Sequence, residues 1–167
     1  VALGACAVST SKVRLGTGVT NMVTRHPAVT ANAAKSLNML SKGRAVLGVG
    51  AGDSAVRTAG LSPARLPQIR QRIEFMRALL QGKEVDALEW GVDSEANTWG
   101  SESKIHVVGA EQWGNLPIQL ACMGPTSVRA AGELCDGVIV DGHMGGNAEG
   151  VRKTVETAIE GAKNAGK

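Results

Sequence analysis

The chain has 167 residues and a formal net charge of +3, with 43% hydrophobic and 20% charged residues. This composition excludes an intrinsically disordered chain, and the length suits one domain with a buried core. One Phe, three Trp and no Tyr argue against the aromatic platforms on which nucleic-acid-binding proteins stack bases. The net charge is also well below that of a strongly basic nucleic-acid-binding surface. We therefore predict a single domain, residues 1–167, with no nucleic-acid partner.

The cysteines and the hydropathy limit the cellular environments that we expect for the chain. Cys6, Cys122 and Cys135 lack the spacing of a metal site and cannot all pair with one another, so we expect no metal and a reduced, cytoplasmic location. Without an apolar run of roughly 18 residues, no membrane partner is expected. The first residues do not resemble a signal peptide and suggest a truncated beginning.

The first fifty residues predict a strand–helix–strand unit. The pattern indicates a helix end at 1–10, a strand at 13–20, a helix from Pro27 to about Gly43, and a strand at 44–49. Within the first strand, Gly16 and Gly18 mark a bulge or a close backbone approach. The second strand is apolar on both faces, which is typical of a parallel sheet covered by helices. Five apolar residues recur at helical spacing in this helix: Ala28, Ala31, Ala34, Leu37 and Leu40.

The rest of the chain continues the alternation after one interruption. The predicted elements are a helix at 66–80, strands at 116–123 and 136–141, and helices at 126–134 and 148–163. Residues 83–115 contain all three Trp and break the rhythm, so we expect an irregular excursion, such as a hairpin, on the ligand-facing side of the sheet. Four strands alternating with helices predict a parallel α/β fold. About four βα units amount to half of a (β/α)8 barrel of the TIM type.

A glycine-rich turn follows the second strand. Ligands bind at the carboxyl ends of parallel strands, and Asp53 is the first ionisable side chain beyond this one. The spacing Gly50-x-Gly52-x-x-Ala55 is similar to a dinucleotide-binding fingerprint. That motif follows the first strand of its domain and needs an acidic residue about 20 positions later at a strand end. Glu74 lies in a predicted helix instead, and we disfavour this interpretation.

Several ordered motifs resemble the luciferase-like monooxygenase superfamily. The motifs are Leu15–Asn21, Thr24–Ala31, Leu40–Asp53, Pro117–Ile118, Ala121–Pro125 and Ala131–Ile139. The likeness is strongest to the branch that uses the deazaflavin coenzyme F420, which includes methylenetetrahydromethanopterin reductase. Two departures are Met22, where the family often has Pro, and Ser36-Leu37-Asn38 in place of Thr-Leu-Asp. The segments that would carry strands one, two, seven and eight of the barrel are absent.

The resemblance implies a partial barrel and an oxidoreductase. Such an enzyme transfers a hydride between F420 and a small organic substrate, for example a pterin-type one-carbon carrier. Two alternatives stay open: an FMN-dependent luciferase-like monooxygenase, and a non-catalytic truncated barrel that binds a flavin or a partner. Because half a barrel leaves two strand edges open, we expect a homo-oligomer or association with the missing barrel segments.

The resemblance also assigns site residues. The cofactor-binding residues would be Thr17, Gly18, Val19, Thr20, Asn21, Gly50, Gly52, Ala121, Cys122, Met123, Gly124, Pro125, Gly142 and His143. The third barrel strand would carry a non-proline cis peptide at Gly18–Val19 behind the deazaflavin ring. The turn at 121–125 and the loop at 141–145 would hold the side chain and phosphate of the cofactor through backbone N–H groups.

Three ionisable residues near the strand ends have more than one interpretation. Asp53 would serve hydride transfer as an acid or a charge stabiliser, but an Asp here is equally suited to cap the next helix. Arg25 and His26 follow the third barrel strand. For these two we favour structural roles, an ion pair for Arg25 and a loop-fixing hydrogen bond for His26, over contact with the coenzyme.

Overall fold

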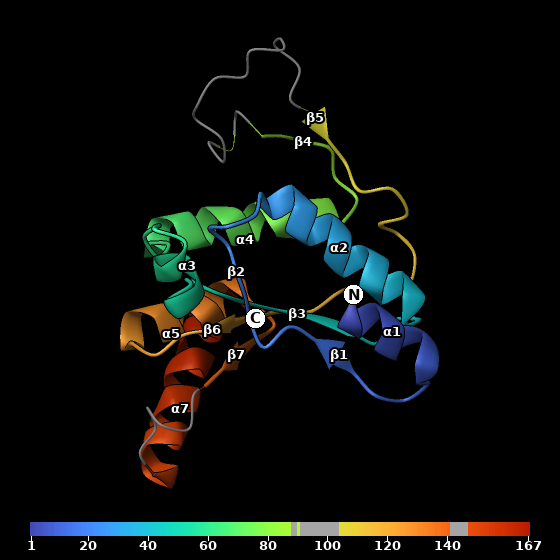
Figure 1. The fold of residues 1–167 in the computed structure, drawn as a ribbon. Helices are drawn as coiled ribbons and strands as arrows, with labels where there is room; N and C mark the ends of the chain where they lie inside the picture. Colours follow the sequence, from blue (N-terminus) through green and yellow to red (C-terminus); the bar gives the residue numbers. More distant parts are fainter. Residues whose placement is uncertain (88–89, 91–103, 141–146) are drawn as a thin grey trace.

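The computed structural model describes residues 1–87, 90, 104–140 and 147–167 of the chain (Figure 1). Its helices are α1 (Ala2–Ser9), α2 (Pro27–Leu40), α3 (Ser54–Thr58), α4 (Leu66–Leu80), α5 (Pro125–Leu134) and α7 (Ala148–Asn164). Its strands are β1 (Leu15–Gly16), β2 (Thr20–Asn21), β3 (Ala45–Gly50), β4 (Val85–Asp86), β5 (Lys104–Ile105), β6 (Ile118–Ala121) and β7 (Gly137–Ile139). Strands and helices alternate as the sequence predicts.

A parallel sheet forms the centre of the fold. Its strands run in the order β1–β3–β6–β7, and β2 also pairs with β3. All of these pairings are parallel. Successive parallel strands joined through helices are the βα units that the sequence indicates, so the parallel α/β prediction is confirmed.

The strand expected at 13–20 is divided into two pieces. β1 and β2 both pair with β3, and the backbone between them contains a cis peptide bond at Gly18–Val19. This is the bond that the family resemblance implies. Nearby, the Thr17 hydroxyl donates a hydrogen bond to the carbonyl oxygen of Gly48 at 2.6 Å, which keeps this segment beside β3.

The core lies between the sheet and the helices. Alternate residues of β3 and β6 are buried on the helix side, namely Ala45, Leu47, Val49, Ile118 and Leu120. Figure 1 shows α2 and α4 next to each other along this side. The largest share of the core comes from α4, through Ile69, Ile73, Phe75, Met76, Leu79 and Leu80. Leu40, the last residue of α2, is 53% exposed and does not contribute to this core.

The described part of the 83–115 excursion lies elsewhere than expected. β4 and β5 do form an antiparallel pair, as a hairpin would. They lie beyond α4, on the side away from the sheet (Figure 1). Trp90 packs edge-on against Phe75 of α4, with ring centroids 5.9 Å apart. The expectation of a ligand-facing position is therefore wrong for these residues. The physical reason is that α4 runs back across the sheet and ends away from the ligand-facing edge, so the chain leaves it there.

Helices α5 and α7 pack through two glycines. A Cβ atom on Gly132 would overlap the carbonyl oxygen of Ala158, and one on Gly161 would overlap that of Arg129. The two helices therefore approach closely enough for backbone to touch backbone. An ion pair between Arg129 and Glu160, at 3.1 Å, lies beside the contact.

We predict that Gly132→Ala destabilises the protein by about 1–3 kcal/mol, because the added methyl group forces the helices apart. Urea unfolding followed by circular dichroism measures the change. Gly4→Ala in α1 is the matched control, since nothing lies within 4 Å of its new Cβ. It should raise stability by about 0.5–1 kcal/mol through helix propensity. Equal effects of the two substitutions would contradict this packing.

Candidate functional site at the carboxyl ends of the strands

The register of the sheet brings four strand ends into one row. Asn21 of β2 pairs with Gly50 of β3, Gly50 pairs with Ala121 of β6, and Ala121 pairs with Ile139 of β7. These residues are far apart in the sequence but lie side by side at the same edge of the sheet. We call the carboxyl ends of these strands, with the turns that follow them, the rim.

A cavity of about 610 Å³ opens at the rim. Its walls come from the segment after the cis peptide, the turn after β3, the end of β6 and its turn, and β7. The side chains of Val19, Leu120, Met123 and Ile139 make much of the wall apolar. Pockets of several hundred Å³ with apolar walls and a few polar groups are typical of small-molecule and cofactor sites.

Glycines keep the β3 side of the cavity open. A Cβ atom on Gly50 would lie 3.0 Å from Cγ2 of Val19 and 3.7 Å from Cβ of Ala121. Gly52 has a φ of +82°, and a Cβ there would overlap Val56 of α3. The turn therefore needs glycine at 52 for its backbone conformation, and glycine at 50 for the space beside Val19.

Asp53 stands at the mouth of the cavity. Its carboxylate accepts a hydrogen bond from Nε of Arg57 at 2.6 Å, and its side chain is 81% exposed. Asp53 occupies the N-cap position of α3, but its side chain makes no capping hydrogen bond. Of the two interpretations from the sequence, helix capping is therefore not what the carboxylate does. It remains accessible to a molecule in the cavity.

The cysteine in the cavity wall is a neutral group. Burial raises the pKa of Cys122 to about 11. Burial likewise raises the pKa of Cys135, the C-cap residue of α5 in the core, to about 12. Because thiolates are the reactive form of cysteine, neither thiol is a nucleophile near pH 7. Cys122 contributes a small, weakly polar surface to the cavity.

The N-terminus of α5 borders the same cavity. Gly124 is its N-cap residue, Pro125 is its first residue, and Ser127 in its first turn lines the cavity. The Ser127 hydroxyl donates to the carbonyl oxygen of Gly124 at 2.8 Å, so it does not cap the helix N–H groups. Within the described residues no other side chain caps them either. Free N–H groups at a helix start favour anions.

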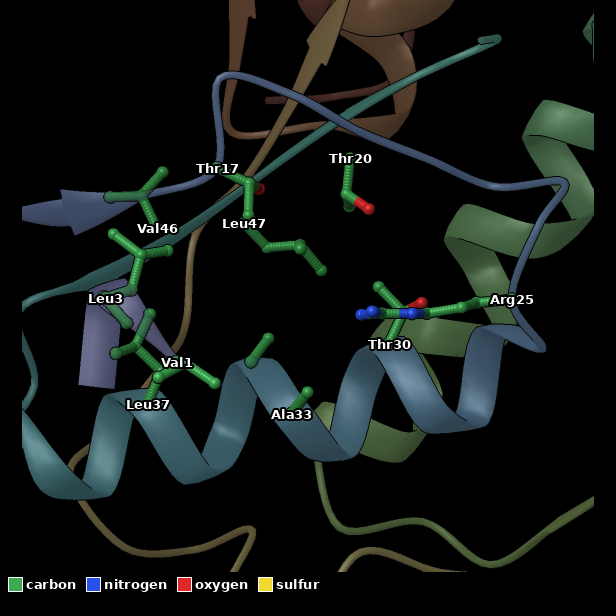
Figure 2. Close-up of a pocket in the computed structure, with 12 residues that line it drawn as sticks. Val1, Leu3, Thr17, Thr20, Arg25, Thr30, Ala33, Leu37, Val46 and Leu47 are labelled. Atoms are coloured by element: carbon green, nitrogen blue, oxygen red, sulfur yellow. The ribbon is translucent and has the colours of Figure 1, made fainter. Parts of the chain in front are cut away.

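The structure gathers part of the predicted site and separates the rest. Eight predicted residues line the rim cavity: Val19, Gly50, Gly52, Asp53, Ala121, Cys122, Met123 and Gly124. Thr17 and Thr20 line a different, smaller cavity (Figure 2). Pro125 faces a third cavity beside α7, and Gly18 lines none of these. Gly142 and His143 lie outside the described residues.

Asn21 belongs to the rim but is committed to a turn. Its Oδ1 accepts hydrogen bonds from the backbone N–H of Val23, at 2.9 Å, and of Thr24, at 2.8 Å. These bonds shape the loop that leads to α2. His26 then accepts a hydrogen bond from the N–H of Ala28 at 3.1 Å, which confirms its expected role in fixing the loop.

Sequence reasoning missed five residues of the cavity wall: Ala51, Ile69, Leu120, Ser127 and Ile139. Ala51, Leu120 and Ile139 carry a local signal, because they lie in or directly after an apolar strand. Ile69 of α4 and Ser127 of α5 depend on how the helices are placed over the sheet.

In the described part of the chain, no three His, Cys, Asp or Glu side chains lie together as a metal ion would need. No helix among the same residues has the length and apolar character of a membrane span.

Comparison with known proteins identifies relatives along the whole chain. The family described as luciferase-like monooxygenase matches residues 1–167. The 5,10-methylenetetrahydromethanopterin reductase of Methanolobus tindarius is 34% identical over 167 residues, covering 96% of this chain and 46% of the relative. The F420-dependent glucose-6-phosphate dehydrogenase of Nocardia farcinica is 32% identical over 177 residues, covering 99% and 48%.

Solved structures agree with the sequence relatives. The coenzyme F420-dependent tetrahydromethanopterin reductase from Methanopyrus kandleri is similar with a TM-score of 0.71 and 29% identity, over 99% of this chain and 49% of that one. An F420-dependent secondary alcohol dehydrogenase, in complex with an F420–acetone adduct, has a TM-score of 0.74 but 24% identity, over 99% and 49%, and supports the fold alone. These neighbours are TIM-barrel enzymes, so the predicted fold class is confirmed. The chain spans about half the length of the relatives it matches. It belongs to the luciferase-like monooxygenase family.

Proposed function

We propose that the rim cavity binds the deazaflavin ring of coenzyme F420 and that the chain serves hydride transfer to or from a small organic substrate. One observation carries the proposal: an apolar cavity of about 610 Å³ lies where four parallel strands end. A second support comes from two groups of relatives at 32–34% identity, which are named as a methylenetetrahydromethanopterin reductase and an F420-dependent dehydrogenase. When bound, F420 gives or takes the hydride at its central ring.

The residues present fit a flat, tricyclic group. Gly50 leaves room that a Cβ would close, since that atom would meet Val19 at 3.0 Å. Val19 and Ile139 would shield the two faces of a planar ring from water. The N-terminus of α5, at the other side of the cavity, suits the anionic tail of the cofactor. The chain thus offers an apolar slot joined to an anion site.

Asp53 is the acid–base group that the chain supplies. Its carboxylate lies at the mouth of the cavity and is balanced by Arg57. Hydride transfer creates or removes positive charge on the substrate carbon. In this role the carboxylate either holds a proton for the substrate or stabilises that charge, and both actions need it close to the ring. Arg57 fixes the carboxylate in position.

A pterin-type one-carbon carrier is the substrate that we propose. Its support is that the reductase of Methanolobus tindarius is named for methylenetetrahydromethanopterin. We also propose that residues 1–167 act as one domain in the cytoplasm. In the described structure all three cysteines are free thiols, as is usual in a reducing compartment.

We predict that Gly50→Ala weakens binding of F420 about tenfold, because the new methyl group pushes Val19 into the slot. Quenching of F420 fluorescence during titration measures the dissociation constant. Gly4→Ala, remote from the cavity, should bind like the wild-type protein. The same titration with FMN tests the monooxygenase alternative. Tighter binding of FMN than of F420 would refute the F420 assignment, and binding of neither would refute the cofactor site.

We predict that Asp53→Asn lowers the rate of F420-dependent reduction of the one-carbon carrier about a hundredfold or more while F420 affinity is kept. Stopped-flow absorbance of the deazaflavin measures this rate. Glu74→Gln, an exposed carboxylate on α4, is the matched control and should retain the wild-type rate. A wild-type rate in Asp53→Asn would remove this carboxylate from the mechanism. No hydride transfer by the wild-type chain would favour the alternative of a binding remnant.

We further propose that the chain associates, with a second copy or with other barrel segments. Within the described residues, β1 and β7 each pair on one side only. Along α7, Val151, Val155 and Ile159 are 40%, 42% and 48% exposed and lie one turn apart, as a contact surface would. Unpaired strand edges and such apolar stripes both favour association.

Sedimentation velocity at micromolar concentration tests this association. We expect the lone chain to sediment above the mass of one chain, and Val155→Glu to lower that mass because it places a charge in the α7 stripe. Glu156→Gln, an exposed neighbour, should sediment like the wild-type chain. A stable wild-type monomer would contradict the proposal.

A further inference from the structure

A second cavity lies on the helix side of the sheet, between α1, α2 and the strands β1–β3. Its volume is about 210 Å³, and it shares no lining residue with the rim cavity. Figure 2 shows that its two ends differ. Leu37, Val46 and Leu3 surround one end. At the other, Arg25 extends over α2 beside Thr30, and Thr20 lies above them.

Thr30 has an unsatisfied hydroxyl at this polar end. The residue is 6% exposed, and among the described residues its Oγ1 has no hydrogen-bond partner. Its backbone N–H is used normally and donates to the carbonyl oxygen of His26 at 3.3 Å. A buried hydroxyl without a partner destabilises a protein, so such groups usually indicate a missing partner.

Arg25 has the complementary property. The sequence predicts an ion pair for it, but no ion pair or hydrogen bond joins its side chain to any described residue. Other arginines of the structure do have carboxylate partners, namely Arg57, Arg70, Arg77 and Arg129. Arg25 is an exposed residue, and its guanidinium extends over the polar end of the cavity, as Figure 2 shows. A cation and an orphan hydroxyl thus face the same small space.

We propose that this cavity binds a carboxylate group on a small apolar body. The guanidinium fork matches two carboxylate oxygens, and the Thr30 hydroxyl donates to one of them. Arg25 is the one ionised side chain among the lining residues, while Val1, with its terminal amine, also lines the cavity beside Leu37. The planar fork of the guanidinium therefore favours a carboxylate by its geometry. The Leu37 end accommodates an aliphatic group. The carboxylate belongs either to a free small molecule or to an acidic side chain of a polypeptide.

Thermal unfolding of the full chain with two pairs of probes tests the proposal and distinguishes the sources. Sodium isobutyrate is compared with its neutral isostere isobutyramide, and acetyl-Asp-Leu-amide with acetyl-Asn-Leu-amide. We expect a saturable rise in the unfolding temperature with a carboxylate probe and none with its amide. A response to isobutyrate assigns the site to a small molecule, and a response to the aspartyl peptide alone assigns it to a polypeptide.

Variants locate the effect at Arg25. Arg25→Gln should abolish the rise, and Arg152→Gln, an exposed arginine of α7, should leave it unchanged. Absence of a rise with both carboxylates overturns the proposal. So does an equal rise with the amides or in Arg25→Gln. F420 binding at the rim is measured separately and does not enter these outcomes.

Thr30 provides a second test that does not depend on Arg25. Thr30→Val keeps the shape of the side chain but removes the orphan hydroxyl. Without a probe, its unfolding temperature should equal or exceed that of the wild-type chain, and probe affinity should fall about tenfold. Thr30→Ser should retain the affinity. A clear loss of stability in unliganded Thr30→Val would show that the hydroxyl already has a partner, and would overturn the proposal.

Discussion

Everything at the candidate site depends on the parallel register of β3 with its neighbours. β3 pairs with β2 on one side and with β6 on the other, which aligns Asn21, Gly50 and Ala121 in one row. A slip of one residue would turn every side chain of a strand to the opposite face. The buried residues Leu47 and Val49 oppose such a slip, because it would place them away from the helices. The hydrophobic core therefore fixes the geometry of the rim.

Successive residues of an extended segment point to opposite sides, and this explains why neighbouring residues have different environments. Val19 lines the rim cavity, whereas Thr20, the next residue, lines the cavity under α2. Two chemically distinct spaces thus lie on opposite sides of one thin segment. The rim cavity is apolar and borders a helix N-terminus, while the smaller cavity contains Arg25 and the orphan hydroxyl of Thr30. We propose the first for a flat cofactor and the second for a carboxylate.

Much of the fold could be predicted from the sequence because local patterns determine it. α4 has the predicted bounds. β3 is formed by the apolar run that ends at the glycines of the turn. α3 was not predicted, because five residues are too few to show helical periodicity. In the candidate site, Gly50, Gly52 and Asp53 could be named because they end β3 or closely follow it. Ile69, Ser127 and the separation of Thr17 and Thr20 from the rim could not, since they depend on strand register and helix placement.

Hydrogen–deuterium exchange of the whole chain, with and without F420, tests the central claim most directly. The claim is that turns from separate parts of the sequence form one cofactor site. The account predicts that F420 protects the amides of residues 19–21, 50–53 and 121–127 together, at the same cofactor concentration. Protection confined to one of these segments, or located away from the rim, would contradict it.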